Sequence, residues 1–379
     1  MNKLGGDQIR VGLPVPFDCY DGQGNLLLRK GLVVDSQKQV DFLLERGLYG
    51  MGGAATGPGS DAVEKPPTPF QLLDDFTNRL KQLLATLSGI TEVSVEQPAA
   101  HNFPERVLNL ASEVQLLCQK DADALLGAIH LAKGSRYSLD HPLYRSVVTD
   151  LLGTRKGLPL EERQRMVAAS LTCDISMVKL QDELVRQTGP LSPVQKQLIE
   201  AHPLESARLL EALGVVDKEW ITAVAQHHEV LNGKGYPRRC SGADVSLWAR
   251  VLKLADMYTA MISAKAYRKA ALSKSAMREI LLKRGTEIDD SLSVLIVKEL
   301  GIYPPGAFVK LQSGELGIVI KRHVNPKTPI IKAVVGPRGA PFDTPIPRKT
   351  DVREYEILDV VERDAIVKLD LHKLWGYDT

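Results

Sequence analysis

Residues 227–237 read HHEVLNGKGYP, a pair of histidines followed directly by a loop rich in glycine. The apolar run at residues 220–225 has the composition of a helix, and the two imidazoles end it. One of two adjacent histidines can face a helical core, but both cannot. Gly235 accepts a positive φ, while Tyr236 and Pro237 add a flat aromatic ring and a stiff corner. The stretch predicts a metal site under a loop, with a surface histidine pair beside an ordinary loop as the alternative.

Length and composition describe an ordinary multidomain protein. The chain has 379 residues, of which 44% are hydrophobic and 25% are charged, so two or three domains are expected. A net charge of +2 gives no reason to expect nucleic acid or a membrane surface as a partner. The first residues lack the apolar core of a signal peptide, and no run is long enough to span a bilayer. Four scattered cysteines without a CxxC pair fit a reduced compartment, so we expect a cytoplasmic protein.

Composition divides the chain into five segments, and the whole is predicted to be mainly α. Residues 1–53 alternate and turn like a small α/β domain, and residues 54–69 are a Gly- and Pro-containing linker. Residues 70–103 hold an amphipathic connecting helix for packing or for homodimerisation. Residues 104–301 repeat apolar positions with the helical period, which predicts a bundle. Residues 302–379 show short strands between Gly and Pro turns, typical of a small β domain of the SH3-like kind.

Prolines and apolar runs give finer expectations inside the last two segments. A helix is predicted to open near Pro142, because proline is favoured in a first helical turn. The pair His202-Pro203 is predicted to separate two helices. Strands are expected from Phe308 to Leu311, over residues 316–320 and over residues 329–335.

Histidines and aspartates accumulate in the helical segment at helix ends or on apolar faces. A carboxylate in an apolar stripe, such as Asp174 or Asp256, is costly unless it is paired or bound to a metal. Either carboxylate alone is more often a helix cap or a satisfied core group. Imidazole and carboxylate together suit Fe, Mn or Zn, and a shared carboxylate is a natural bridge between two metal ions. The candidate ligands are His141, Asp174, His202, His227, His228 and Asp256.

The order of these residues resembles the HD-GYP family, helical phosphohydrolases that cleave the bacterial messenger cyclic di-GMP. Four segments between about residues 141 and 268 carry the resemblance. They are His202-Pro203, residues 227–237, LADMY at 254–258 and AYRKA at 266–270. The resemblance implies an HD-domain-like helical bundle that holds two or three divalent transition-metal ions, commonly Fe or Mn.

The resemblance also implies roles for single residues. It makes the six candidate ligands metal-binding, with Asp174 central to catalysis, and it aims Lys265 and Arg268 at phosphate oxygens. Without it, these two basic residues would be taken as solvated. Tyr236, with Gly235 and Pro237 beside it, would stack on guanine or contact a partner; packing of the loop itself is an equally good account.

Several positions depart from the family pattern. Cys173 stands where the family has a histidine ligand, and Met177 stands where it has a lysine. Tyr137 and Thr259 occupy positions where three-metal members carry acidic ligands. Cys173 is either a thiolate ligand to Fe or Zn or a small buried side chain. The site therefore matches the family pattern only on the side built from Asp174, His202, His227 and His228, and the metal could have been lost.

Two functional hypotheses follow. The first is a metal-dependent phosphodiesterase that converts cyclic di-GMP to pGpG or GMP in bacterial second-messenger signalling, and the sequence favours it slightly. The second is a degenerate HD-GYP module that binds cyclic di-GMP, or a diguanylate cyclase with a GGDEF domain, without turnover. A weaker third hypothesis is a helical scaffold whose flanking domains carry the function.

Overall fold

The computed structural model describes residues 67–87, 102–131, 136–263, 270–362 and 368–377, together with shorter segments of the first 66 residues. The chain forms two compact units, Met1–Pro66 and Pro67–Thr379, and each is described by itself. Most of the predicted linker at residues 54–69 lies outside the described residues, as do residues 88–101 of the predicted connecting helix.

The described segments of the first unit form four short strands and one helix. The elements are β1 (Asn2–Lys3), β2 (Cys19–Tyr20), β3 (Leu26–Leu28), α1 (Gln37–Arg46) and β4 (Leu48–Tyr49). The strands pair antiparallel in the order β1-β4-β2-β3. Buried Val40 and Leu43 of α1 join Ile9, Val15 and Cys19 in a small apolar core.

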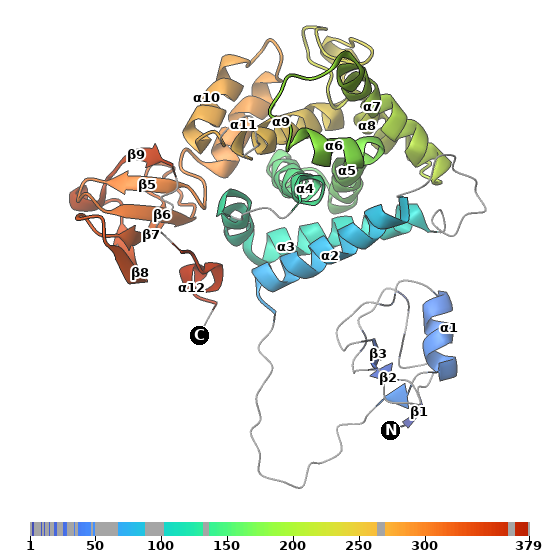
Figure 1. Ribbon diagram of the computed structural model, residues 1–379, viewed down its shortest axis with the longest axis horizontal. Coiled ribbons are helices and arrows are strands. Elements are labelled where there is room, and N and C mark those ends of the chain that lie inside the picture. Colours follow the sequence, from blue (N-terminus) through green and yellow to red (C-terminus); the bar gives the residue numbers. More distant parts are fainter. Residues whose placement is uncertain are drawn as a thin grey trace. The chain divides into compact units, whose positions relative to one another are not determined.

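The second unit is mainly helical, with a small antiparallel sheet at its C-terminal end (Figure 1). Its helices are α2 (Pro69–Leu87), α3 (Phe103–Leu131), α4 (Tyr137–Lys156), α5 (Leu160–Thr172), α6 (Val178–Leu184), α7 (Pro193–Ala212), α8 (Lys218–Gln226), α9 (Leu247–Ile262), α10 (Ser273–Leu282) and α11 (Asp290–Leu300). One continuous core joins α2 through α11, with the large buried side chains Phe103, Trp220, Trp248 and Tyr258 among its members. Helix α4 packs against α3, α5, α9 and α11, so it lies at the centre of the bundle.

Two predicted helix boundaries at prolines are wrong. Helix α4 begins at Tyr137, five residues before Pro142, and α7 runs unbroken through Pro203. Proline 203 has no N–H to donate to the carbonyl of Ile199, four residues earlier. The Nδ1 atom of His202 contacts that carbonyl oxygen at 2.6 Å instead. The side chain of the preceding histidine thus replaces the missing backbone hydrogen bond, and the helix continues.

The C-terminal sheet has five strands, β5 (Phe308–Leu311), β6 (Leu316–Lys321), β7 (Ile330–Val335), β8 (Pro341–Lys349) and β9 (Ile357–Val361), in the order β8-β7-β6-β5-β9. All neighbours are antiparallel. The three strands predicted from the sequence are β5, β6 and β7. Strand β8 was not predicted, because Pro345 and Pro347 interrupt its pattern. It lies at the edge of the sheet, where a strand tolerates missing N–H donors.

The sheet is fastened to the helices by charge and by packing. Arg322, just after β6, donates through Nε to Asp123 at 2.5 Å and through Nη1 to Glu299 at 2.5 Å. Helix α12 (Leu371–Trp375) follows the sheet and lays Trp375 against α3. A Cβ atom at Gly127 would lie 2.2 Å from the Trp375 ring, so only glycine admits this contact. Across the described residues, no helix combines the length and apolar character needed to cross a membrane.

Candidate metal centre

Five segments of the helical bundle bring the predicted ligands together. His141 lies in the second turn of α4, and Asp174 follows the end of α5. His202 lies in the middle of α7, and the pair His227-His228 follows α8. The sixth residue, Asp256, comes from α9. The fold gathers all six into two adjoining groups that share Asp174, each with its ligand atoms within 4.8 Å of one another.

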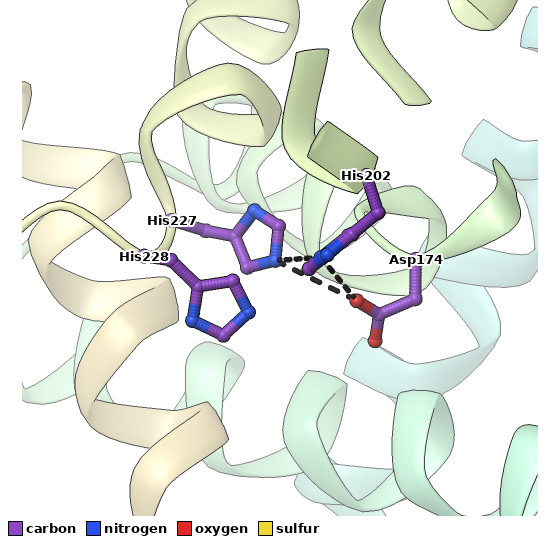
Figure 2. A group of neighbouring side chains, drawn as sticks. All are labelled: Asp174, His202, His227 and His228. Atoms are coloured by element: carbon purple, nitrogen blue, oxygen red, sulfur yellow. Dashed lines mark hydrogen bonds and ion pairs between the residues drawn. The ribbon is translucent and has the colours of Figure 1, made fainter. Parts of the chain in front are cut away.

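The first group consists of Asp174, His202, His227 and His228 (Figure 2). The Nε2 atoms of His202 and His227 lie 3.1 Å apart, and they lie 3.2 Å and 3.5 Å from Oδ1 of Asp174. On the far side of each ring, Nδ1 donates to a backbone carbonyl oxygen, that of Ile199 or Val224, at 2.6 Å. A neutral ring with its proton on Nδ1 carries a lone pair on Nε2. Two lone pairs and a carboxylate oxygen therefore converge on one point, which is an arrangement that a cation stabilises.

Ionisation states in this first group agree with cation binding. Burial opposes the charge on Asp174, but Arg145, His202 and His227 outweigh it and hold the pKa of the carboxyl well below its ordinary value. Burial lowers the pKa of His227, and burial together with His227 lowers the pKa of His228 well below its ordinary value. At neutral pH the group therefore offers the carboxylate of Asp174 and the neutral imidazoles of His227 and His228, the protonation states that ligands require.

The second group consists of His141, Asp174 and Asp256. The positively charged side chain of Arg145 lies between its two carboxylates. Arg145, fully buried one turn after His141, places Nη1 2.6 Å from Oδ2 of Asp174 and 3.0 Å from Oδ1 of Asp256. Its Nε and Nη2 atoms donate to the carbonyl oxygen of Ser170 at 3.1 Å and 2.8 Å. The Nε2 atom of His141 lies 2.8 Å from Oδ1 of Asp256, while its buried Nδ1 has no hydrogen-bond partner in the described part of the chain. Sequence reasoning missed Arg145; its only signal was a basic residue inside an otherwise apolar helical run.

A cavity of about 480 Å³ opens onto both groups. His228, Tyr236 and Asp256 form part of its wall, and Tyr236 stacks on His228 with the ring centres 4.7 Å apart. The apolar part of the wall comes from Met177, Leu184, Val185, Leu191 and Ile199. Among the described residues, no lysine or arginine lines this cavity.

The loop after the histidine pair folds back tightly on itself. A Cβ atom at Gly235 would lie 2.6 Å from the Cα of Glu229 and 2.7 Å from the carbonyl oxygen of His228. This close approach requires glycine, and it sets the next residue, Tyr236, over His228. Gly235 and Pro237 line a separate depression on the surface, together with Tyr236.

The structure shows the surroundings of Cys173, Tyr137 and Thr259, which depart from the family pattern. Cys173 is buried, belongs to neither ligand group, and donates through Sγ to the carbonyl oxygen of Ser170 at 3.7 Å. Burial raises the pKa of this thiol well above its ordinary value, against the opposing effect of Arg145, which favours the interpretation of a small buried side chain. Tyr137 stacks on His141 with ring centres 4.8 Å apart, and Thr259 donates to the carbonyl oxygen of Ala255. The two predicted phosphate-binding residues, Lys265 and Arg268, lie outside the described residues.

The segment that contains this centre is similar to a known protein family. Residues 128–292 match the family model described as HD domain. The chain is 27% identical over 270 residues to the cyclic di-GMP phosphodiesterase PA4108 of Pseudomonas aeruginosa, covering 71% of this chain and 63% of that protein. The segment that holds the centre is therefore similar to HD domains. Within this segment, the departures at Cys173 and Met177 leave the first ligand group intact.

Two further relatives of the chain come from other bacteria. It is 26% identical to the 3'3'-cGAMP-specific phosphodiesterase 3 of Vibrio cholerae, covering 62% of this chain and 55% of that protein. It is also 26% identical to the cyclic di-GMP phosphodiesterase response regulator RpfG of Xanthomonas campestris, covering 60% of this chain and 58% of that protein. The chain thus spans less than two thirds of the length of these curated relatives. The solved structure of Bd1817, an HDG"Y"P protein from Bdellovibrio bacteriovorus, aligns with a TM-score of 0.48 and 15% identity, over 76% of this chain and 95% of that one.

Proposed function

We propose that the chain is a metal-dependent phosphodiesterase that hydrolyses cyclic di-GMP to pGpG or GMP. The observation that carries the proposal is the convergence of Nε2 of His202, Nε2 of His227 and Oδ1 of Asp174 on one point. The relatives named for cyclic di-GMP and 3'3'-cGAMP phosphodiesterase activity support the substrate class. The donor set of imidazole and carboxylate suits Fe or Mn, which we propose as the ion.

The residues of the chain divide the work of binding and orientation. Asp174, His202 and His227 would hold the ion, and His228, at the edge of the cavity, would complete the set. A bound divalent ion supplies Lewis acidity toward a phosphate oxygen and lowers the pKa of water at the site. The hydrogen bonds from both Nδ1 atoms to backbone carbonyl oxygens fix the rings, so the ligand geometry exists before the ion arrives.

The cavity would hold the nucleotide. Its apolar wall excludes water, and the Tyr236 ring offers an aromatic surface on which a guanine base could stack. We propose that Lys265 and Arg268 bind the phosphates, as the resemblance implies.

The test is hydrolysis of cyclic di-GMP, with 3'3'-cGAMP in parallel, by protein purified anaerobically and loaded with Mn²⁺ or Fe²⁺. Chromatography of the products should show pGpG or GMP. The variant His202→Ala should lose bound metal and activity together, because it removes one of the converging lone pairs. The matched control is His323→Ala, which removes an exposed histidine after β6 and should leave both unchanged. A loaded wild type that leaves both cyclic dinucleotides intact contradicts the proposed activity.

One observation favours the second candidate, a module that binds cyclic di-GMP without turnover. Met177, at the position of the family's lysine, lines the cavity and presents a thioether where a positive charge would stabilise the transition state. Calorimetric titration with cyclic di-GMP distinguishes the candidates, since binding with intact ligand after long incubation supports the module alone. A GGDEF-domain partner, a homodimer and an SH3-like classification of the C-terminal sheet remain further proposals.

A further inference from the structure

The second ligand group contains a positive charge that belongs to the chain. His141, Asp174 and Asp256 present their ligand atoms within 4.8 Å of one another, as a metal site would. The Nη1 atom of Arg145 lies between the two carboxylates, at 2.6 Å from Asp174 and 3.0 Å from Asp256. A guanidinium therefore already neutralises negative charge between these two carboxylates.

The guanidinium is fixed in this place. Arg145 has no exposed surface, and the carbonyl oxygen of Ser170 receives its Nε and Nη2 protons while the two carboxylates receive those of Nη1. A guanidinium keeps its charge at all physiological pH values and has no lone pair to offer a metal ion. A second divalent ion would have to displace the side chain from this buried network or sit in contact with a like charge.

The two oxygen atoms of the Asp174 carboxylate face different partners. Its Oδ1 faces His202 and His227 of the first group, and its Oδ2 faces Arg145. A carboxylate that bridges two metal ions gives one oxygen to each. Here one oxygen is directed to the first ligand group and the other to an arginine.

We propose that Arg145 fills the second cation position of the centre, so that the chain binds a single metal ion at Asp174, His202, His227 and His228. This inference rests on the proposed metal binding of the first group. It assigns His141 and Asp256 to the support of Arg145: the carboxylate of Asp256 accepts from Arg145, and His141 lies against that same oxygen. The expected stoichiometry is one divalent ion per chain.

The first experiment uses the wild-type chain. It is purified anaerobically, stripped with a chelator, and titrated with Mn²⁺, and the bound metal is counted by mass spectrometry. We expect one Mn²⁺ per chain and the electron paramagnetic resonance spectrum of an isolated ion. Two ions per chain with an exchange-coupled spectrum, as for ions about 3.5–4 Å apart, would overturn the role of Arg145 while leaving the proposed function in place. No bound Mn²⁺ at all would overturn the first-group site and this inference with it.

The second experiment removes the guanidinium. The variant Arg145→Ala frees Asp174 and Asp256, and we expect the stoichiometry to rise from one to two Mn²⁺ per chain, with an exchange-coupled spectrum. The matched control Arg155→Ala removes an exposed arginine of the same helix, paired with Glu299, and should stay at one. A folded Arg145→Ala protein that still binds one ion contradicts the inference; if the variant does not fold, the spectrum of the wild type decides.

Discussion

Replacing Asp174 by asparagine tests the centre in depth, because this one carboxylate belongs to both ligand groups. The change keeps the shape of the side chain and removes its charge. Arg145 loses its 2.6 Å partner and keeps Asp256 at 3.0 Å and the Ser170 carbonyl oxygen. Removing one partner of a buried ion pair typically costs about 3–5 kcal/mol, and the retained partners reduce this to about 2–4 kcal/mol for the metal-free protein.

That loss of stability has a measurable size. In a helical unit of this length, about 2–4 kcal/mol lowers Tm by roughly 3–8 °C, which calorimetry of the chelated protein resolves. The same substitution removes the only charged ligand of the first group, so Mn²⁺ affinity should fall at least about 100-fold in a calorimetric titration. The control is Asp359→Asn, which breaks an exposed pair with Lys274 and should change neither quantity measurably. An Asp174→Asn protein with wild-type Tm and wild-type Mn²⁺ affinity would refute the reasoning.

Three further predictions concern the surroundings of the centre. Gly235→Ala puts a Cβ atom 2.6 Å from the backbone of Glu229, so the loop must shift, and we expect at least a tenfold loss of cyclic di-GMP affinity by calorimetry if the Tyr236 surface binds the nucleotide. Burial lowers the pKa of His130 from 6.5 to about 4, so as the pH falls below about 6.5 the unfolded state takes up the proton first; the free energy of unfolding should drop by about 1–2 kcal/mol between pH 7 and pH 5, and His130→Gln should reduce that slope in urea titrations at the two pH values. Arg322→Ala leaves two carboxylates, Asp123 and Glu299, without their shared arginine, and we expect a loss of about 1–3 kcal/mol in urea unfolding; an unchanged midpoint would show that these ion pairs do not stabilise the sheet against the helices.

Periodicity and turn residues predicted the parts of the fold that depend on local pattern. The helical bundle and the strands β5, β6 and β7 follow from apolar spacing and from Gly and Pro breaks. The prolines of β8 hid that strand, because its tolerance of them comes from its edge position in the sheet. The error at Pro203 has a similar origin, since the hydrogen bond that lets α7 continue is made by a side chain.

The sequence predicted which candidate ligands come together, but it did not predict the arginine that lies between them. His141, Asp174, His202, His227, His228 and Asp256 do come together, as the resemblance implied. Arg145 could not be found, because only the packing of α4 against the end of α5 shows that its guanidinium enters the group. Its helical pattern alone indicates an arginine facing the core, which is costly without a partner that lies far away in the sequence.

The pair His202-Pro203 acts as one structural unit. Proline leaves a backbone carbonyl oxygen without its usual donor, and the neighbouring imidazole takes that oxygen with Nδ1 and so aims Nε2 at Asp174. Restoring an N–H at position 203 would let the backbone compete for the same oxygen, and the ring would lose the contact that selects its tautomer. Substitutions at these two adjacent positions should therefore be non-additive in a double-mutant cycle. Proline breaks helices elsewhere, but here it helps to fix which ring nitrogen of a candidate ligand carries the proton.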